Sequence, residues 1–181
     1  DYFLLLGIGS LPMALLHSVH LLSHPSVSII PGGIETATRS LAGAGAFLAV
    51  SLLVAPTFLG RRLRPVPVLT ASIILGGAAI ILILLVDTAV FHGADGVPTT
   101  SSTAVHIGLA ALLLAGLGRL RRHGDRLDAD VYHAVTGATL AAAAAEAAFS
   151  LEIIVPAYAG LAGHVALAFA FYLFFRAVVE T

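Results

Sequence analysis

Long apolar stretches alternate with short polar ones along the whole chain. A helix needs about 20 apolar residues to cross the hydrocarbon core of a bilayer, and six stretches have roughly this length: residues 2–23, 34–59, 66–91, 101–117, 129–150 and 157–179. Backbone groups in lipid must pair internally, which excludes open sheets, and these runs are too continuous for barrel strands. The pattern predicts an all-α bundle of six transmembrane helices. Because the connections are short, we expect sequence neighbours to pack as antiparallel neighbours in one domain, residues 1–181.

The composition also indicates a membrane protein. Hydrophobic residues make up 59% of the chain and charged residues 10%, whereas about 25% of the residues in an average soluble domain are charged. The mean hydropathy is +1.01. The chain contains no cysteine, so a metal site would need histidine or carboxylate ligands. The formal net charge of -1 gives no indication of a nucleic-acid partner.

The basic residues predict the orientation of the bundle. Short loops rich in arginine mark the cytoplasmic side of a membrane, and eight of the nine arginines lie between the apolar runs or near the end of the last run: Arg61, Arg62, Arg64, Arg119, Arg121, Arg122, Arg126 and Arg176. We therefore expect both termini to be cytoplasmic, in the plasma membrane of a prokaryote. The turns near residues 24–25, 92–100 and 153–156 would then face outward. Arg39 is the exception to this pattern.

Ionisable residues inside membrane spans are costly, so each of them is a candidate functional residue. At a rise of about 1.5 Å per residue, eight of those in this chain would lie within roughly 12 Å of the outer ends of their spans. They are His17, His20, Arg39, Asp87, His92, His106, Glu146 and His164. The spans therefore direct polar groups into one outer layer.

The histidines of this layer suggest a cofactor. His17 and His20 are three residues apart, so their side chains share one face of the first helix. Such a pair can hold a metal ion, with His106, Glu146 or His164 completing a tetrahedral site from other helices. The same histidines can instead serve as axial ligands of a haem b. In the alternative without a cofactor, each imidazole only bonds a backbone carbonyl or a neighbouring side chain.

The charged side chains of the layer suggest an ion pair. Arginine binds a carboxylate through two hydrogen bonds, so we expect Arg39 and Glu146 to pair; alternatively, Arg39 binds an anionic ligand. Asp87 lies nearer the interface, where water can solvate it. Glu35 and Glu152 fall at or beyond the outer boundary, where exposure is the default expectation.

Sequence motifs of hydrolytic enzymes are absent. The chain has no nucleotide-binding loop, no Gly-x-Ser-x-Gly elbow and no His-Glu-x-x-His pattern. Below the outer layer the spans are apolar, which disfavours a proton or ion conduit. We expect a protein without enzymatic activity of its own.

Several segments resemble the third type of membrane-associated sensor domain, the multi-span amino-terminal module of bacterial and archaeal histidine kinases and diguanylate cyclases. They are MALLHSVH at 13–20, ATRSL at 37–41, LVAPTFL at 53–59, AEAAF at 145–149, GLAGH at 160–164 and FYLFFRAVV at 171–179. The resemblance covers nearly the whole chain in the same order. By this resemblance, His17, Arg39, Glu146 and His164 match the family's characteristic polar positions.

The chain departs from the family pattern before the fourth span. The family usually has a lysine and then a glutamate there, whereas this chain has Ser101, Ser102 and His106, and it contains no tryptophan. An additional histidine in this region favours a metal or haem as the ligand.

Our leading hypothesis is a sensory input domain whose outer pocket binds a metal, a haem or a small molecule and signals through the last helix. The resemblance implies homodimerisation and a cytoplasmic output domain attached after residue 181. The alternatives are a small electron carrier that holds haem b between histidines, and a structural subunit whose polar layer only specifies packing.

Overall fold

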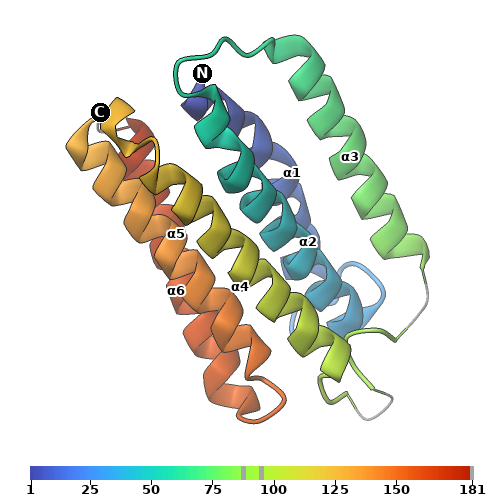
Figure 1. Cartoon of the computed structure of the whole chain (residues 1–181). Helices are drawn as coiled ribbons and strands as arrows, with labels where there is room; N and C mark the ends of the chain where they lie inside the picture. The colour runs from blue at the N-terminus through green and yellow to red at the C-terminus, as the bar shows by residue number, and fades with distance from the viewer. Residues whose placement is uncertain (87–88, 94–95, 180–181) are drawn as a thin grey trace.

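The computed structural model describes residues 1–86, 89–93 and 96–179, and within these residues helices account for nearly all of the regular structure (Figure 1). Six long helices follow one another along the chain, with two short 3₁₀ turns between them. They are α1 (Tyr2–Ser23), α2 (Gly33–Val54), η1 (Ala55–Phe58), α3 (Pro65–Leu85), α4 (Thr100–Arg121), η2 (Gly124–Arg126), α5 (Ala129–Ser150) and α6 (Pro156–Val179). The expected all-α architecture is confirmed.

Three of the expected helix ends differ from the structure. The second α-helix ends at Val54 rather than near residue 59, and the chain continues as the 3₁₀ turn η1. The third helix ends at Leu85 rather than near residue 91, because Val86 is extended with ψ of 107° and its carbonyl accepts a hydrogen bond from Arg39. The fourth helix is one turn longer than expected and ends at Arg121, where the arginines of its last turn favour the negative end of the helix dipole.

Five of the six helices are long and apolar enough to cross a membrane. The exception among the described helices is α5, which has 22 residues but carries Glu146, two threonines, a histidine and many alanines in place of larger apolar residues. This helix packs along both α4 and α6, and Thr139 and Glu146 are buried against them, whereas His133 is exposed. The sixth transmembrane span therefore remains a prediction.

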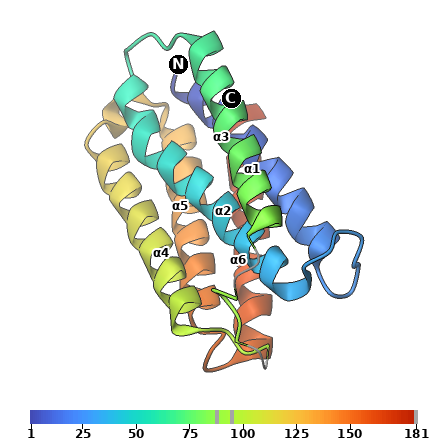
Figure 2. The ribbon, with the colours of Figure 1, turned by 90° about the vertical axis from the view of Figure 1, so that its right-hand side faces the viewer.

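The helices do not all pack on their sequence neighbours. The pairs α1–α2, α4–α5 and α5–α6 are extensive, as expected. However, α3 packs mainly on α1 at the edge of the bundle, and α2 packs on α4 instead (Figures 1 and 2). Gly76 is the buried residue of α3, and a Cβ added to it would lie 2.6 Å from the Cβ of Pro12. Gly76 thus allows α3 to approach α1 closely, and most of the rest of α3 is exposed; its mean hydropathy of 2.7 is the highest among the five candidate spans.

The polar connections separate into two ends of the bundle. One end of the bundle holds the start of α1, the end of α6, the loop at 59–64 and η2 (Figure 1). We call this the arginine end. There Arg126 donates to the carbonyl of Leu59 over 2.9 Å and ties the two arginine-rich loops together. The opposite end, with the 24–32 and 151–155 loops, is the histidine end.

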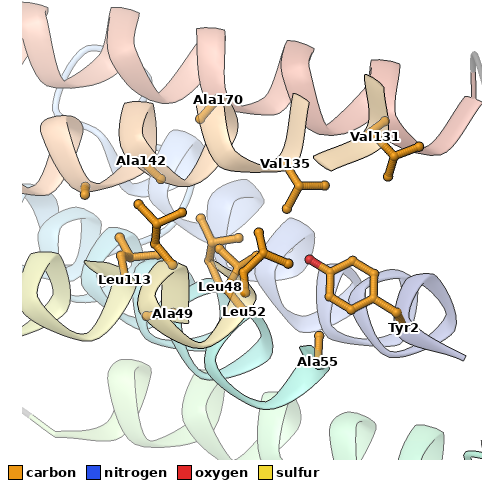
Figure 3. Packing of buried hydrophobic residues seen from close by; sticks show 14 of the residues in the cluster. Tyr2, Leu48, Ala49, Leu52, Ala55, Leu113, Val131, Val135, Ala142 and Ala170 are labelled. Carbon is orange, nitrogen blue, oxygen red and sulfur yellow. The ribbon is translucent and has the colours of Figure 1, made fainter. Parts of the chain in front are cut away.

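The main hydrophobic core occupies the arginine half of the bundle. Figure 3 shows its side chains converging from α1, α2, α4, α5 and α6. The buried members include Tyr2, Leu48, Ala49, Leu52, Ala55, Leu113, Val131, Val135, Ala142 and Ala170. Many of them are alanines, which allow close helix contacts in lipid. This apolar core packs the helices together in the arginine half, and the buried histidine and glutamate side chains lie toward the histidine end.

Candidate functional site

A buried histidine and glutamate lie between α4 and α5. The Nδ1 atom of His106 is 2.7 Å from Oε2 of Glu146, and the two residues are 1% and 4% exposed. Gly45 of α2 provides the space for this carboxylate, because a Cβ added there would lie 2.4 Å from Oε1 of Glu146. A residue larger than glycine at position 45 would therefore collide with the buried Glu146 carboxyl group.

The expected ion pair between Arg39 and Glu146 is wrong. Arg39 instead donates from Nε to Oε1 of Glu35 over 2.9 Å, and it also bonds the Val86 carbonyl. The two partners lie one turn apart on α2, and such i,i+4 pairs meet on a helix surface. The carboxyl group of Glu146 instead contacts His106 on the adjacent helix α4.

The Glu35 carboxylate also holds the segment after α3. It accepts hydrogen bonds from the backbone N–H groups of Val90, Phe91 and His92 at 2.8–3.1 Å, and its side chain is 17% exposed. The expectation of a solvated Glu35 is therefore wrong. The i,i+4 spacing of Glu35 and Arg39 was the available sequence signal, but the loop that they bind is remote in sequence.

His20 of α1 and His164 of α6 face each other across the bundle. The Nδ1 atom of His20 lies 2.8 Å from the carbonyl of Ala37, and that of His164 lies 2.7 Å from the carbonyl of Gly160. The two Nε2 atoms are 3.4 Å apart. The ring centroids are 5.6 Å apart. This is close to the sum of the Nε2–Nε2 distance and the two distances from each ring centre to its own Nε2 atom. The rings therefore meet through their Nε2 edges rather than stacking face on face.

Aromatic rings surround this pair. Phe149 of α5 contacts the His164 ring edge to face, with centroids 5.1 Å apart. It fits there because the preceding residue on α6 is Gly163, where a Cβ would lie 2.4 Å from the Phe149 ring. One turn from His20, His17 packs edge to face on Phe171 of α6, with centroids 5.4 Å apart.

Glu152, in the turn between α5 and α6, adds a carboxylate at the same end. Its side chain is partly buried, and burial raises the pKa of this carboxyl above its ordinary value, against the opposing influence of the nearby His106, His164 and His92. A Cβ added to Gly160 would lie 2.5 Å from Oε1 of Glu152. Sequence reasoning treated Glu152 as exposed, because the turn that folds it back over α6 leaves no periodic signal.

The whole chain, residues 1–181, matches the MASE3 family, described as a membrane-associated sensor domain. The chain belongs to this family. No curated protein matches the chain, and no solved structure does. Family membership together with the apolar helices identifies an integral membrane protein with a sensory role.

The MASE3 domain divides the predicted ligand residues into two pairs. His106 bonds Glu146, and His20 faces His164, while His17 lies beside the second pair. In the described part of the chain, no three histidine, aspartate or glutamate side chains form a group arranged to hold a metal ion. Another candidate, Asp87, lies outside the described residues.

The facing histidines are too close to be axial ligands of one haem. Two metal–imidazole bonds of about 2.0 Å on opposite sides of an iron would separate the nitrogens by about 4 Å. His20 and His164 have 3.4 Å between their Nε2 atoms, and a porphyrin plane between them would require α1 and α6 to move apart.

An apolar cleft of about 280 Å³ separates α1 from α6 in the arginine half of the MASE3 domain. Its lining includes Gly7 and Met13 from α1, Ser51 from α2, and Phe175 and Val178 from α6. The contacts between α1 and α6 are few compared with those between α5 and α6. The histidine pair is therefore a principal polar link between the first helix and the last.

Proposed function

We propose that this MASE3 domain is a sensory input module without catalytic activity of its own, which binds its ligand between α1 and α6 at the histidine end and signals through α6. The observation that carries the proposal is the approach of the His20 and His164 Nε2 atoms to 3.4 Å. His164 is exposed, so a ligand has access to the pair from one side.

The packing of α6 supports a role in transmission. This helix lies along α5, whereas its contact with α1 is limited to the histidine end and the walls of the cleft. Because the two Nε2 atoms are only 3.4 Å apart, a ligand that binds both imidazoles changes the separation of the histidine ends of α1 and α6. The cleft of about 280 Å³ below them gives α6 room to tilt. The size of the shift is limited by the difference in ligand affinity between the two packings.

The arginine end is then the cytoplasmic end, in agreement with the distribution of arginines in membrane proteins. Both termini lie at this cytoplasmic end, and the protein resides in the plasma membrane of a prokaryote. In this position the shift of α6 reaches a cytoplasmic output domain or the α6 helix of a second copy.

A cross-linking experiment tests this function on the full chain in lipid nanodiscs. The chain has no native cysteine, so Gly7→Cys and Val178→Cys place one unique thiol pair across the cleft. A Cβ at Gly7 has no other atom within 4 Å. The rate of reaction with a short bis-maleimide then reports the distance between α1 and α6.

We expect His164→Ala to change this rate, since it removes the link between α1 and α6 from the exposed side. His133→Ala is the matched control: this exposed histidine lies on α5 at the arginine end and should leave the rate unchanged. Equal rates in the parent and in both His20→Ala and His164→Ala would contradict the proposal. The polar layer would then specify packing only.

A further inference from the structure

Two loops at the arginine end carry most of the positive charge of the chain. Within the residues that the structure describes, no carboxylate pairs with any of their arginines. The bond from Arg126 to the carbonyl of Leu59 holds the two loops together. Guanidinium groups bind phosphate through two hydrogen bonds, so these side chains are available to a phosphate group. All seven are exposed: Arg61, Arg62, Arg64, Arg119, Arg121, Arg122 and Arg126.

The 59–64 loop lies against the start of α1, where the backbone N–H of Leu63 donates to the side chain of Asp1. The apolar cleft between α1 and α6 begins deeper in the bundle. Its lining on α1 runs from Leu6 to Met13, about 7–18 Å from Asp1 at a rise of about 1.5 Å per residue. A bilayer leaflet has about 5–8 Å of headgroups above about 15 Å of hydrocarbon. With the start of α1 among the headgroups, the cleft therefore lies at the depth of the acyl chains.

The cleft is open to lipid and large enough for a hydrocarbon chain. A Cβ added to Gly7 meets no atom within 4 Å, so this glycine leaves its side of the cleft empty. Phe175 and Val178 of α6 are 58% and 54% exposed, which places the mouth of the cleft on the outer surface of the bundle. Its volume of about 280 Å³ is nearly twice the roughly 150 Å³ that accommodates benzene in an apolar protein cavity.

We infer that the arginine end binds an anionic phospholipid, with one acyl chain in the cleft between α1 and α6 and the phosphate on the arginines of the 59–64 loop. Exposed arginines alone fit any acid, and an apolar cleft alone fits any hydrocarbon. Together, at one end of the bundle and at matching depths, they fit a molecule with an anionic head and an apolar chain. Basic clusters beside a membrane helix attract such lipids. The inference is independent of the histidine pair, which lies toward the opposite end.

Fluorescence quenching by brominated lipids tests the inference on the full chain in phosphatidylcholine nanodiscs. The chain has no tryptophan, so Phe175→Trp places a single fluorophore at the mouth of the cleft. Ile74→Trp, at a position on α3 that is 63% exposed, is the matched control. A minor fraction of the lipid carries bromine on its acyl chains, as either phosphatidylglycerol or phosphatidylcholine.

We expect brominated phosphatidylglycerol to quench Phe175→Trp at a fraction at least about fivefold lower than brominated phosphatidylcholine does, since one basic residue near an anionic surface contributes about this factor. Both lipids should quench Ile74→Trp equally. Equal quenching of Phe175→Trp by the two lipids overturns the inference. It is also overturned if neither lipid quenches Phe175→Trp while both quench Ile74→Trp, because a second copy or another segment would then cover the cleft.

Two charge variants in the Phe175→Trp chain locate the headgroup. Arg61→Gln together with Arg62→Gln should remove the preference for phosphatidylglycerol, because this loop borders the start of α1. Arg121→Gln together with Arg122→Gln removes the same charge from the other loop and should have a smaller effect. If both pairs reduce the preference equally, or neither does, the phosphate is not bound at the 59–64 loop and the inference is wrong.

Discussion

Replacing Gly45 with alanine tests whether the glutamate of the buried pair is held as tightly as the structure indicates. The new methyl group would lie 2.4 Å from Oε1 of Glu146 and 3.2 Å from Cδ1 of Leu109. The leucine can rotate away. The carboxylate cannot withdraw without losing its 2.7 Å contact with His106, because both side chains are almost fully buried.

The expected magnitude follows from two opposing effects. Overpacking a core costs about 1–3 kcal/mol, while exchanging a helical glycine for alanine gains about 0.5–1 kcal/mol. We therefore expect Gly45→Ala to lower the free energy of unfolding by about 1 kcal/mol, within a range of about 0–2.5 kcal/mol. Gly43→Ala is the matched control on the same helix, since its Cβ would only reach ordinary contact with Leu16 at 3.4 Å. This variant should be neutral or slightly stabilising.

Reversible unfolding in mixed detergent micelles, with increasing fractions of dodecyl sulfate, measures both variants. The double-mutant cycle with Glu146→Ala is the decisive comparison. Without the carboxylate, Gly45→Ala should no longer destabilise, so the coupling free energy should be about 1–3 kcal/mol. If Gly45→Ala is as stable as Gly43→Ala, or costs the same with and without Glu146, the tight placement of this carboxylate is refuted.

Two further predictions concern the carboxylates that sequence reasoning treated as exposed. Glu35→Ala removes the acceptor for Arg39 and for the backbone amides at 90–92, so we expect these amides to exchange hydrogen at least about tenfold faster, a loss of 1.4 kcal/mol or more. Exchange in the 24–32 loop serves as the internal control, and equal acceleration there would indicate general unfolding instead. Burial raises the pKa of Glu152 above its ordinary 4.5, so its contribution to stability is complete below pH 4.5 and is lost as pH rises through the raised value. The melting temperature should therefore fall less between about pH 4 and 8 for Glu152→Gln than for the parent. Parallel pH profiles of the two melting temperatures would contradict this prediction.

The sequence was sufficient for the helices themselves. The expected spans at 2–23 and 157–179 agree with α1 and α6 to within one residue, because long apolar runs in a chain this hydrophobic have few alternatives to helix in lipid. The boundary at Leu85 was missed for a tertiary reason. The apolar run continues beyond it, but Arg39 and Glu35 from α2 bind the backbone that follows.

The sequence also indicated that His20, His106, Glu146 and His164 lie toward the same end of the bundle. Depth along a helix follows directly from position in the span, at about 1.5 Å per residue. Partners do not follow from depth, since pairing depends on the rotation and neighbours of each helix. This is why Glu146 was matched with Arg39, although α4 brings His106 to it at 2.7 Å.

Packing of the tertiary structure alone decided how the polar layer is divided. Helix α3 lies on α1 rather than between α2 and α4, so α2 packs on α4 and Gly45 can accommodate Glu146. The chain end returns α6 to the vicinity of α1, which brings His164 within 3.4 Å of His20 across 144 positions of sequence. Sequence periodicity fixes which face of a helix is polar, whereas a contact between two remote faces depends on the packing of every helix between them.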